Sequence, residues 1–241
     1  MYRVPPYIVA AAIDEASIRF VWDDTRASQD FTYPPERWLN RWRGLSDAAQ
    51  IALGIGIYEW IVWRFHRLSA DPLPLQIAEA AWCASVDPAR VEYVELERAD
   101  WIGPIRGPLW CAVTWLMPMI FEGRAKPEEI ASGLSYLLRL AMHVSPRIEP
   151  FLDWLGAVTS RFEALYPAVA DDPFASLFAA SDQQVHEDAV PREMLDPAPG
   201  VDGRAGWPEA QQMLDVDPAN PLLLTPEQVR RRQRGRMFPD N

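Results

Sequence analysis

The chain has 241 residues, enough for one large or two small domains, of which 49% are hydrophobic and 24% are charged. These proportions are typical of a folded globular protein and exclude a chain that is disordered throughout. The net charge of −11 opposes non-specific binding to nucleic acids and to anionic membranes, because both are polyanions. We therefore expect neither of them as the main partner.

Apolar runs and basic residues suggest where the protein works. The longest apolar stretches, 51–65 and 109–121, are interrupted by Glu59 and Pro118, and both are shorter than the ~20 residues that span a membrane. The N-terminal residues do not have the pattern of a signal peptide. Of the 23 basic residues 22 are arginine, a bias typical of a GC-rich bacterial genome. We predict a cytoplasmic bacterial protein.

Tryptophan is abundant, with 11 residues in the chain and ten of them before residue 170. Several of them, such as Trp60 and Trp63, lie in apolar stretches and are separated by the spacing of one helical turn. Aromatic side chains bury the largest apolar area per residue. The pattern therefore predicts a substantial packed core, an adhesive surface, or both.

Capping signals and helical periodicity predict three helices in the first part of the chain. The first is expected over 7–22, after a Pro-Pro start, and a short aromatic helix contains Trp38 and Trp42. Ser46 is a suitable N-cap for a long helix that extends to Leu68. Apolar residues of this long helix repeat at steps of four and three on one face: Ile51, Ile55, Tyr58, Val62 and Phe65.

Proline marks the beginnings of the later helices. One helix is expected after Asp71, and helix is preferred over strand for 90–97. A loop with three proline or glycine residues should precede a helix over 109–122, which Pro118 should kink or end. Gly54 and Gly56 of the long helix are expected to permit close packing of a neighbouring helix.

Two further helices are predicted over 127–143 and 150–165, which gives an all-α, irregular bundle of six to eight helices. The stripes of these helices face one another in such a bundle and should form its core. The predicted core residues are Ile55, Tyr58, Val62, Phe65, Leu137, Phe151, Leu155, Val158 and Phe162.

The composition changes at residue 170, which divides the chain into a helical body over 1–169 and a C-terminal arm over 170–241. The arm holds nine of the 23 prolines, and 12 acidic residues against two arginines lie between residues 171 and 229. The last 12 residues reverse this balance, with five arginines and one aspartate. We expect an extended arm that docks short apolar segments on its own body or on a partner. Its predicted contact residues are Phe174, Phe178, Leu195, Trp207, Arg231 and Arg234.

One face of the long helix carries the strongest candidate for catalysis. Gly56, Glu59, Trp63 and His66 are spaced by three, four and three residues and therefore share that face. Glu59 and His66 could act as an acid–base pair in a pocket walled by Trp63. The alternative is a structural pair that nearby arginines or the backbone of a neighbouring helix satisfy.

No motif for a metal, a nucleotide or another cofactor occurs in the chain. Paired-histidine metal motifs, glycine-rich phosphate loops and nucleophile elbows are all missing from the sequence. Cys83 and Cys111 lie in apolar runs and lack the spacing of metal ligands. We expect both to be buried thiols, and we predict no cofactor and no metal.

The sequence favours a non-enzymatic interaction component of a bacterial system, such as an adaptor, an immunity-type inhibitor or an accessory subunit. Tyrosine, tryptophan and arginine dominate the energetics of protein interfaces, and the acidic balance suits a basic protein partner. One alternative is an enzyme of unrecognised type with its site near Glu59, Trp63 and His66. A second alternative is nucleic-acid contact through the C-terminal arginines.

Overall fold

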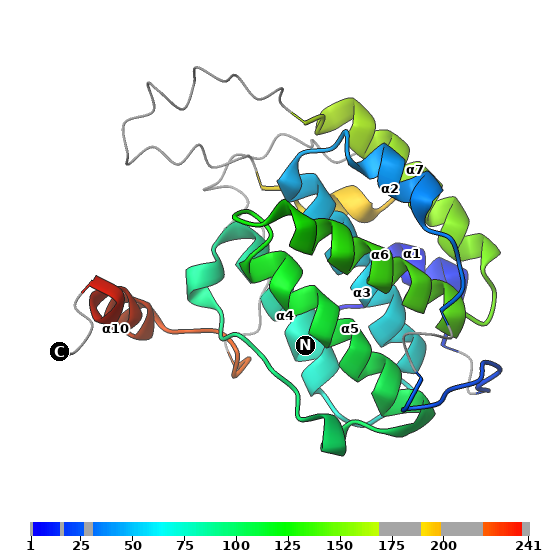
Figure 1. Ribbon diagram of the computed structural model, residues 1–241, viewed down its shortest axis with the longest axis horizontal. Helices are drawn as coiled ribbons and strands as arrows, with labels where there is room; N and C mark the ends of the chain where they lie inside the picture. The colour runs from blue at the N-terminus through cyan, green and yellow to red at the C-terminus, as the bar shows by residue number, and fades with distance from the viewer. Residues whose placement is uncertain (1, 15–16, 27–30, 169–188, 199–218, 238–241) are drawn as a thin grey trace.

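The protein is built from α-helices and short 3₁₀ turns (Figure 1). The described part of the chain contains no β-strand, and its β-type pairing is limited to two isolated antiparallel bridges, Leu45 with Pro167 and Val91 with Leu223. The predicted all-α class is confirmed. The computed structural model describes five segments: residues 2–14, 17–26, 31–168, 189–198 and 219–237.

Eight α-helices and three 3₁₀ turns occur in these segments. The helices are α1 Pro6–Ala11, α2 Glu36–Trp42, α3 Asp47–Phe65, α4 Leu73–Val86, α5 Gly103–Phe121, α6 Pro127–Val144, α7 Glu149–Leu165 and α10 Pro226–Met237. The turns are η1 Pro88–Arg90, η2 Arg98–Asp100 and η3 Arg192–Leu195. None of the described helices is long and apolar enough to cross a membrane.

Helix α3 is the centre of the molecule. It packs against α4, α5, α6, α7 and η3, and every residue from 51 to 65 is buried. Ser46 caps it as predicted, because its hydroxyl accepts a hydrogen bond from the backbone N–H of Ala49. A helix buried on all sides must be apolar on nearly all sides, which explains why α3 is not amphipathic.

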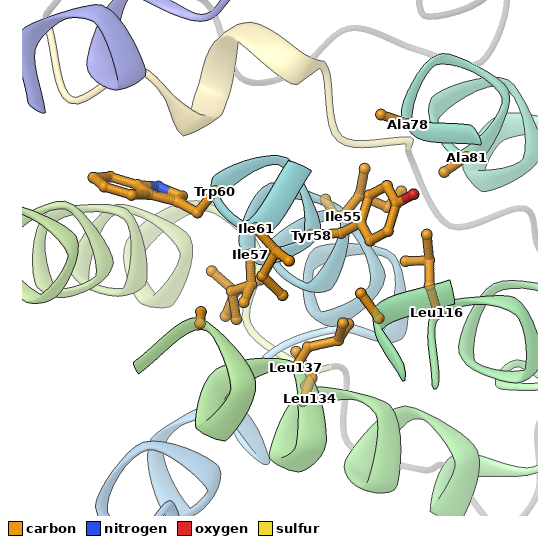
Figure 2. Packing of buried hydrophobic residues seen from close by; sticks show 14 of the residues in the cluster. Ile55, Ile57, Tyr58, Trp60, Ile61, Ala78, Ala81, Leu116, Leu134 and Leu137 are labelled. Atoms are coloured by element: carbon orange, nitrogen blue, oxygen red, sulfur yellow. The ribbon is translucent and has the colours of Figure 1, made fainter. Parts of the chain in front are cut away.

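The side chains of α3 point toward different neighbouring helices (Figure 2). Tyr58 points toward α4, where its hydroxyl donates to the carbonyl of Pro74 at 3.1 Å. Ile57 and Ile61 point toward α6, and Trp60 points in another direction, away from both. All nine predicted core residues are buried, which confirms that the helical stripes form one core.

The two glycines of α3 allow close approach, as expected. A Cβ on Gly54 would lie 2.4 Å from Cε of Met119 in α5. A Cβ on Gly56 would lie 2.6 Å from Cδ1 of Leu195 in η3. Helix α5 and the C-terminal arm therefore both pack against α3 where it lacks a side chain.

The predicted first helix over 7–22 is wrong in length. Helix α1 ends at Ala11, and Ala12 adopts a left-handed conformation with φ of 47°. The segment beyond it is irregular because other residues satisfy its carbonyls: Arg147 donates to Ala11 at 3.0 Å and Arg64 donates to Ser17 at 2.6 Å. These tertiary hydrogen bonds compensate for those that a continued helix would make.

The predictions for 90–97 and for the following loop are also wrong. Residues after η1 are extended, because their backbone forms hydrogen bonds with the arm. The Glu92 N–H, for example, donates to the Leu222 carbonyl at 2.8 Å. Helix α5 begins at Gly103 and includes the residues predicted as a loop. Pro104 lies in the first turn of α5, where a backbone N–H would have no partner within the helix, so the lack of one costs nothing. Pro118 lies inside α5 and does not end it.

Replacing Phe162 with alanine should lower the free energy of unfolding by about 3–5 kcal/mol, because the side chain is fully buried in α7 and its removal leaves a cavity. Chemical denaturation followed by circular dichroism measures this change. A loss below ~1 kcal/mol would show that the α7 stripe does not contribute to the core.

Candidate functional site

Glu59 lies in the middle of α3 and has no exposed surface. Four side chains donate hydrogen bonds to its carboxylate. Tyr7 donates to Oε2 at 2.6 Å, and Arg192 Nε and Trp82 Nε1 donate to Oε1 at 2.8 Å and 3.2 Å. The hydroxyl of Tyr2 also donates to Oε1. We call these five residues the Glu59 network.

The Glu59 network joins parts of the chain that are far apart in sequence. Tyr2 precedes α1, Tyr7 lies in α1, Trp82 lies in α4 and Arg192 begins η3. A buried carboxylate is tolerated only when it is paired and hydrogen-bonded, and here one cation and three neutral donors meet that requirement. The carboxylate therefore fixes the N-terminal segment and the arm on the same face of α3.

The protonation states of the donors suit this role. Burial, and then the negative charge of Glu59, raise the pKa of Tyr2 and Tyr7 well above the ordinary value of 10. Burial lowers the pKa of Arg192, but the charge of Glu59, the neighbouring Tyr2 and Tyr7 and the hydrogen bond to Glu59 together outweigh this and leave that pKa raised. Both phenols therefore keep their protons and Arg192 keeps its charge at neutral pH.

Arg192 also contacts the N-terminal segment directly. Its guanidinium carbon lies 4.2 Å from the centre of the Tyr2 ring, within the range of a cation–π interaction. Its Nη2 donates to the backbone carbonyl of Arg3 at 2.9 Å. One guanidinium thus contacts a carboxylate, an aromatic ring and a carbonyl, which the planar fork of arginine permits and the single ammonium of lysine does not.

An aromatic cluster lies beside the carboxylate. The ring centres of Tyr7 and Trp154 are 5.2 Å apart, and those of Trp60 and Trp154 are 5.5 Å apart. Phe151 lies edge-on to Trp60 with 5.3 Å between the ring centres. This cluster accounts for part of the tryptophan content that the sequence reveals, and it gives η3 a rigid surface to pack on.

Leu195 of the arm packs on this surface and is fully buried. Its side chain fills the notch at Gly56, and its carbonyl accepts a hydrogen bond from Trp154 Nε1 at 2.8 Å. Arg161 of α7 holds the backbone on either side of it. Arg161 donates to four carbonyls of the arm: those of Met194, Asp196, Pro197 and Ala198.

The predicted acid–base pair is not assembled. Glu59 and Trp63 are buried, whereas His66 is exposed where α3 ends and contacts the Trp63 ring with 4.8 Å between the ring centres. The four donors that surround Glu59 include no histidine. The face of α3 that carries Gly56 and Glu59 is covered by the arm and by the N-terminal segment.

The predicted contact residues of the arm fall into three groups. Leu195 docks on the body of its own chain, and Arg231 is exposed on α10. Arg234 lies in α10, although its side chain is outside the described part of the structure. The predictions for Phe174, Phe178 and Trp207 lie outside the described residues.

A second docked stretch of the arm leads into α10. Asn220 is buried, and its Nδ2 donates to the Gln76 carbonyl at 2.9 Å and to Glu79 Oε2 at 2.8 Å. Leu223 then pairs with Val91 in an isolated bridge. These contacts fix the chain on α4 and on the segment after η1 before α10 begins.

The sequence analysis missed Tyr2, Tyr7, Trp82 and Arg192 as members of one network. One signal was present: a carboxylate in the middle of an apolar helix needs buried donors. The sequence does not reveal which donors these are, because they lie between 23 and 133 residues away from Glu59. Arg192 is also one of only two arginines in the acidic stretch of the arm.

No group of three or more histidine, cysteine, aspartate or glutamate side chains in the described residues could hold a metal ion. Cys83 and Cys111 are buried free thiols, as predicted, and burial raises the pKa of each to about 11. Comparisons of the chain with family models, curated proteins and solved structures find no match.

Replacing Glu59 with glutamine should lower the free energy of unfolding by about 3 kcal/mol, because Arg192 keeps its charge but loses its buried counter-ion. Glu163→Gln is a matched control, since it removes the carboxylate from an exposed pair with Arg41 and should cost less than ~1 kcal/mol. Urea denaturation of both variants makes the comparison. Equal losses would show that burial of the Glu59 pair has no energetic consequence.

The free energy of unfolding should fall as the pH rises above about 10. Tyr2 and Tyr7 have raised pKa values in the folded state, so above pH 10 the unfolded chain releases protons that the folded protein retains. Urea denaturation between pH 8 and 11 measures the slope, and Tyr7→Phe should make it shallower above pH 10. An unchanged slope in this variant would show that Tyr7 titrates normally.

Proposed function

We propose that the protein is a non-enzymatic interaction component of a bacterial system, which acts in the cytoplasm by binding another protein. An adaptor, an immunity-type inhibitor and an accessory subunit all fit this class. The observation that carries the proposal is α10, a polar helix whose described side chains, in residues 226–232, are almost all exposed, although buried contacts just before it fix it to the body.

Helix α10 is exposed and has a well-defined beginning. Among residues 226–232 only Val229 is partly buried, and Figure 1 shows α10 standing apart from the packed body. Thr225 and Gln228 form a reciprocal cap: the Thr225 N–H donates to Gln228 Oε1 at 2.8 Å and the Gln228 N–H to Thr225 Oγ1 at 3.3 Å. A helix that is polar all round gains little from its own packing, so presentation to a partner is a consistent use for it.

The charge of α10 indicates the kind of surface that it contacts. Arg230 and Arg231 are exposed, and Arg232 pairs with Glu92 of the body at 2.5 Å. Arg230 and Arg231 are adjacent in sequence, so the first turns of the helix carry two exposed positive charges. An acidic patch on the partner would complement α10, whereas the acidic balance of the body would complement a basic region of the same partner.

The environment of Glu59 supports this class over the enzyme alternative. Four donors occupy the carboxylate, and the arm covers it. A general base has to reach its substrate with a free lone pair, and this one is sealed beneath the chain's own residues. Nucleic acid is a second candidate partner, which the exposed Arg230 and Arg231 favour. The net charge of −11 opposes it, because nucleic acid is a polyanion.

The test is co-purification of tagged protein from cross-linked bacterial cells, followed by titration with the recovered partner. Arg230→Glu with Arg231→Glu should weaken binding at least tenfold, because it reverses two exposed charges of the proposed contact. Arg37→Glu with Arg43→Glu changes two exposed arginines at α2 and should alter binding less than twofold.

Two results would contradict the proposal. One is the absence of any stoichiometric protein partner, and the other is equal binding by both double variants. The nucleic-acid candidate would be supported instead if a 20-base-pair duplex binds the wild type, loses affinity with salt at a slope of ~−0.9 per phosphate contact, and loses binding in the α10 variant.

A further inference from the structure

We propose that the groove that holds η3 is a recognition site for a peptide with an arginine followed three residues later by a leucine. Residues 189–198 occupy this groove as an internal ligand, through Arg192 and Leu195. The inference rests on the interaction role proposed above and deepens it, because it names a second binding site and the chemistry of its ligand. A partner segment of the same chemistry would compete with the arm.

The body recognises the backbone of this segment. Trp154 donates to the Leu195 carbonyl, and Arg161 donates to four other carbonyls of the arm. Hydrogen bonds to carbonyls do not depend on the side chains of the bound segment. Peptide-binding grooves use the same division, with main-chain hydrogen bonds for affinity and pockets for specificity.

The groove has a pocket that selects arginine. Arg192 places its guanidinium against the Glu59 carboxylate, over the Tyr2 ring and next to the Arg3 carbonyl. The side chain of Arg192 is 24% exposed, so this pocket opens to the surface. Lysine would pair with the carboxylate but could not also reach the carbonyl with a second fixed donor.

The groove also has a separate notch for leucine. The notch exists because Gly56 has no side chain, and the Trp154 ring forms its wall, 3.1 Å from where a Gly56 Cβ would lie. Leu195 fills it completely. The two pockets are thus one short turn apart along the ligand, since η3 spans Arg192–Leu195.

The bound segment is separated in sequence from the other docked parts of the chain. Residues 169–188 lie between α7 and this segment, and residues 199–218 lie between it and the stretch at Asn220. Docking of the arm is intramolecular, so a partner peptide displaces it only by binding more tightly or by being present in excess. The arm is therefore a competitor that sets a threshold for an external ligand.

The probe is a fluorescently labelled peptide with the sequence of residues 189–198, and the receptor is the full chain carrying Arg192→Ala and Leu195→Ala. Fluorescence anisotropy should show binding to this receptor at least tenfold tighter than to the wild type, whose groove is occupied. A peptide with alanine at both anchors should not bind, and one with lysine for the arginine should bind at least fivefold more weakly.

Absence of peptide binding to a receptor variant that keeps its helical spectrum and cooperative melting would overturn the inference. A second measurement uses the wild type, in case the variant does not fold. Excess peptide should speed hydrogen exchange at the N–H groups of Met194 and Asp196, which are bonded within the arm segment, and leave those of Glu92 and Leu224 unchanged. Unchanged exchange at all four would also overturn it.

A concentration-dependent dimer that the peptide dissociates would place the arm of a second copy in the groove, and would overturn the assignment to a competing partner. These outcomes are separate from those of the proposed function. The peptide reports on the groove alone, whereas the α10 variants report on the partner, so either result can fail without the other.

Discussion

The buried negative charge of Glu59 organises much of this protein. Removing Glu59 from water is costly unless donors compensate it, and the chain supplies them from its N-terminal segment, α1, α4 and the arm. The N-terminal segment, α1 and η3 are short or irregular where they reach the carboxylate, whereas Trp82 reaches it from within the regular helix α4. The helices form the core by apolar burial, while the carboxylate determines where the non-helical parts lie on it.

Arginine has a related role elsewhere in the structure. The guanidinium of Arg64 donates to the Val144 carbonyl and that of Arg139 to the Phe31 carbonyl, while Arg161 donates to four carbonyls of the arm. Segments without regular secondary structure leave carbonyls unsatisfied, and a side chain with five N–H groups can satisfy several at once. The arginine content that reads as genomic bias in the sequence thus also serves the fold.

The accuracy of the sequence-based predictions followed the range of the interactions involved. Helix α3 was predicted from its cap at Ser46 and its apolar period, because both signals lie within the helix itself. The end of α1 and the extended segment after η1 were not, because a distant arginine and the arm determine them. For the same reason helical spacing places Glu59 and Trp63 on one face of α3, whereas the partners of Glu59, Arg192 above all, were not identifiable from local sequence.

The long separation between Glu59 and Arg192 affects how the protein emerges from a ribosome. The body through α7 ends at residue 165, and Arg192 is made 27 residues later, roughly one to five seconds at ordinary elongation rates. A body that folds within that interval has only the neutral donors for the charge of Glu59 and an empty notch at Gly56. In such a body both sites stay uncovered until the arm that fills them is made.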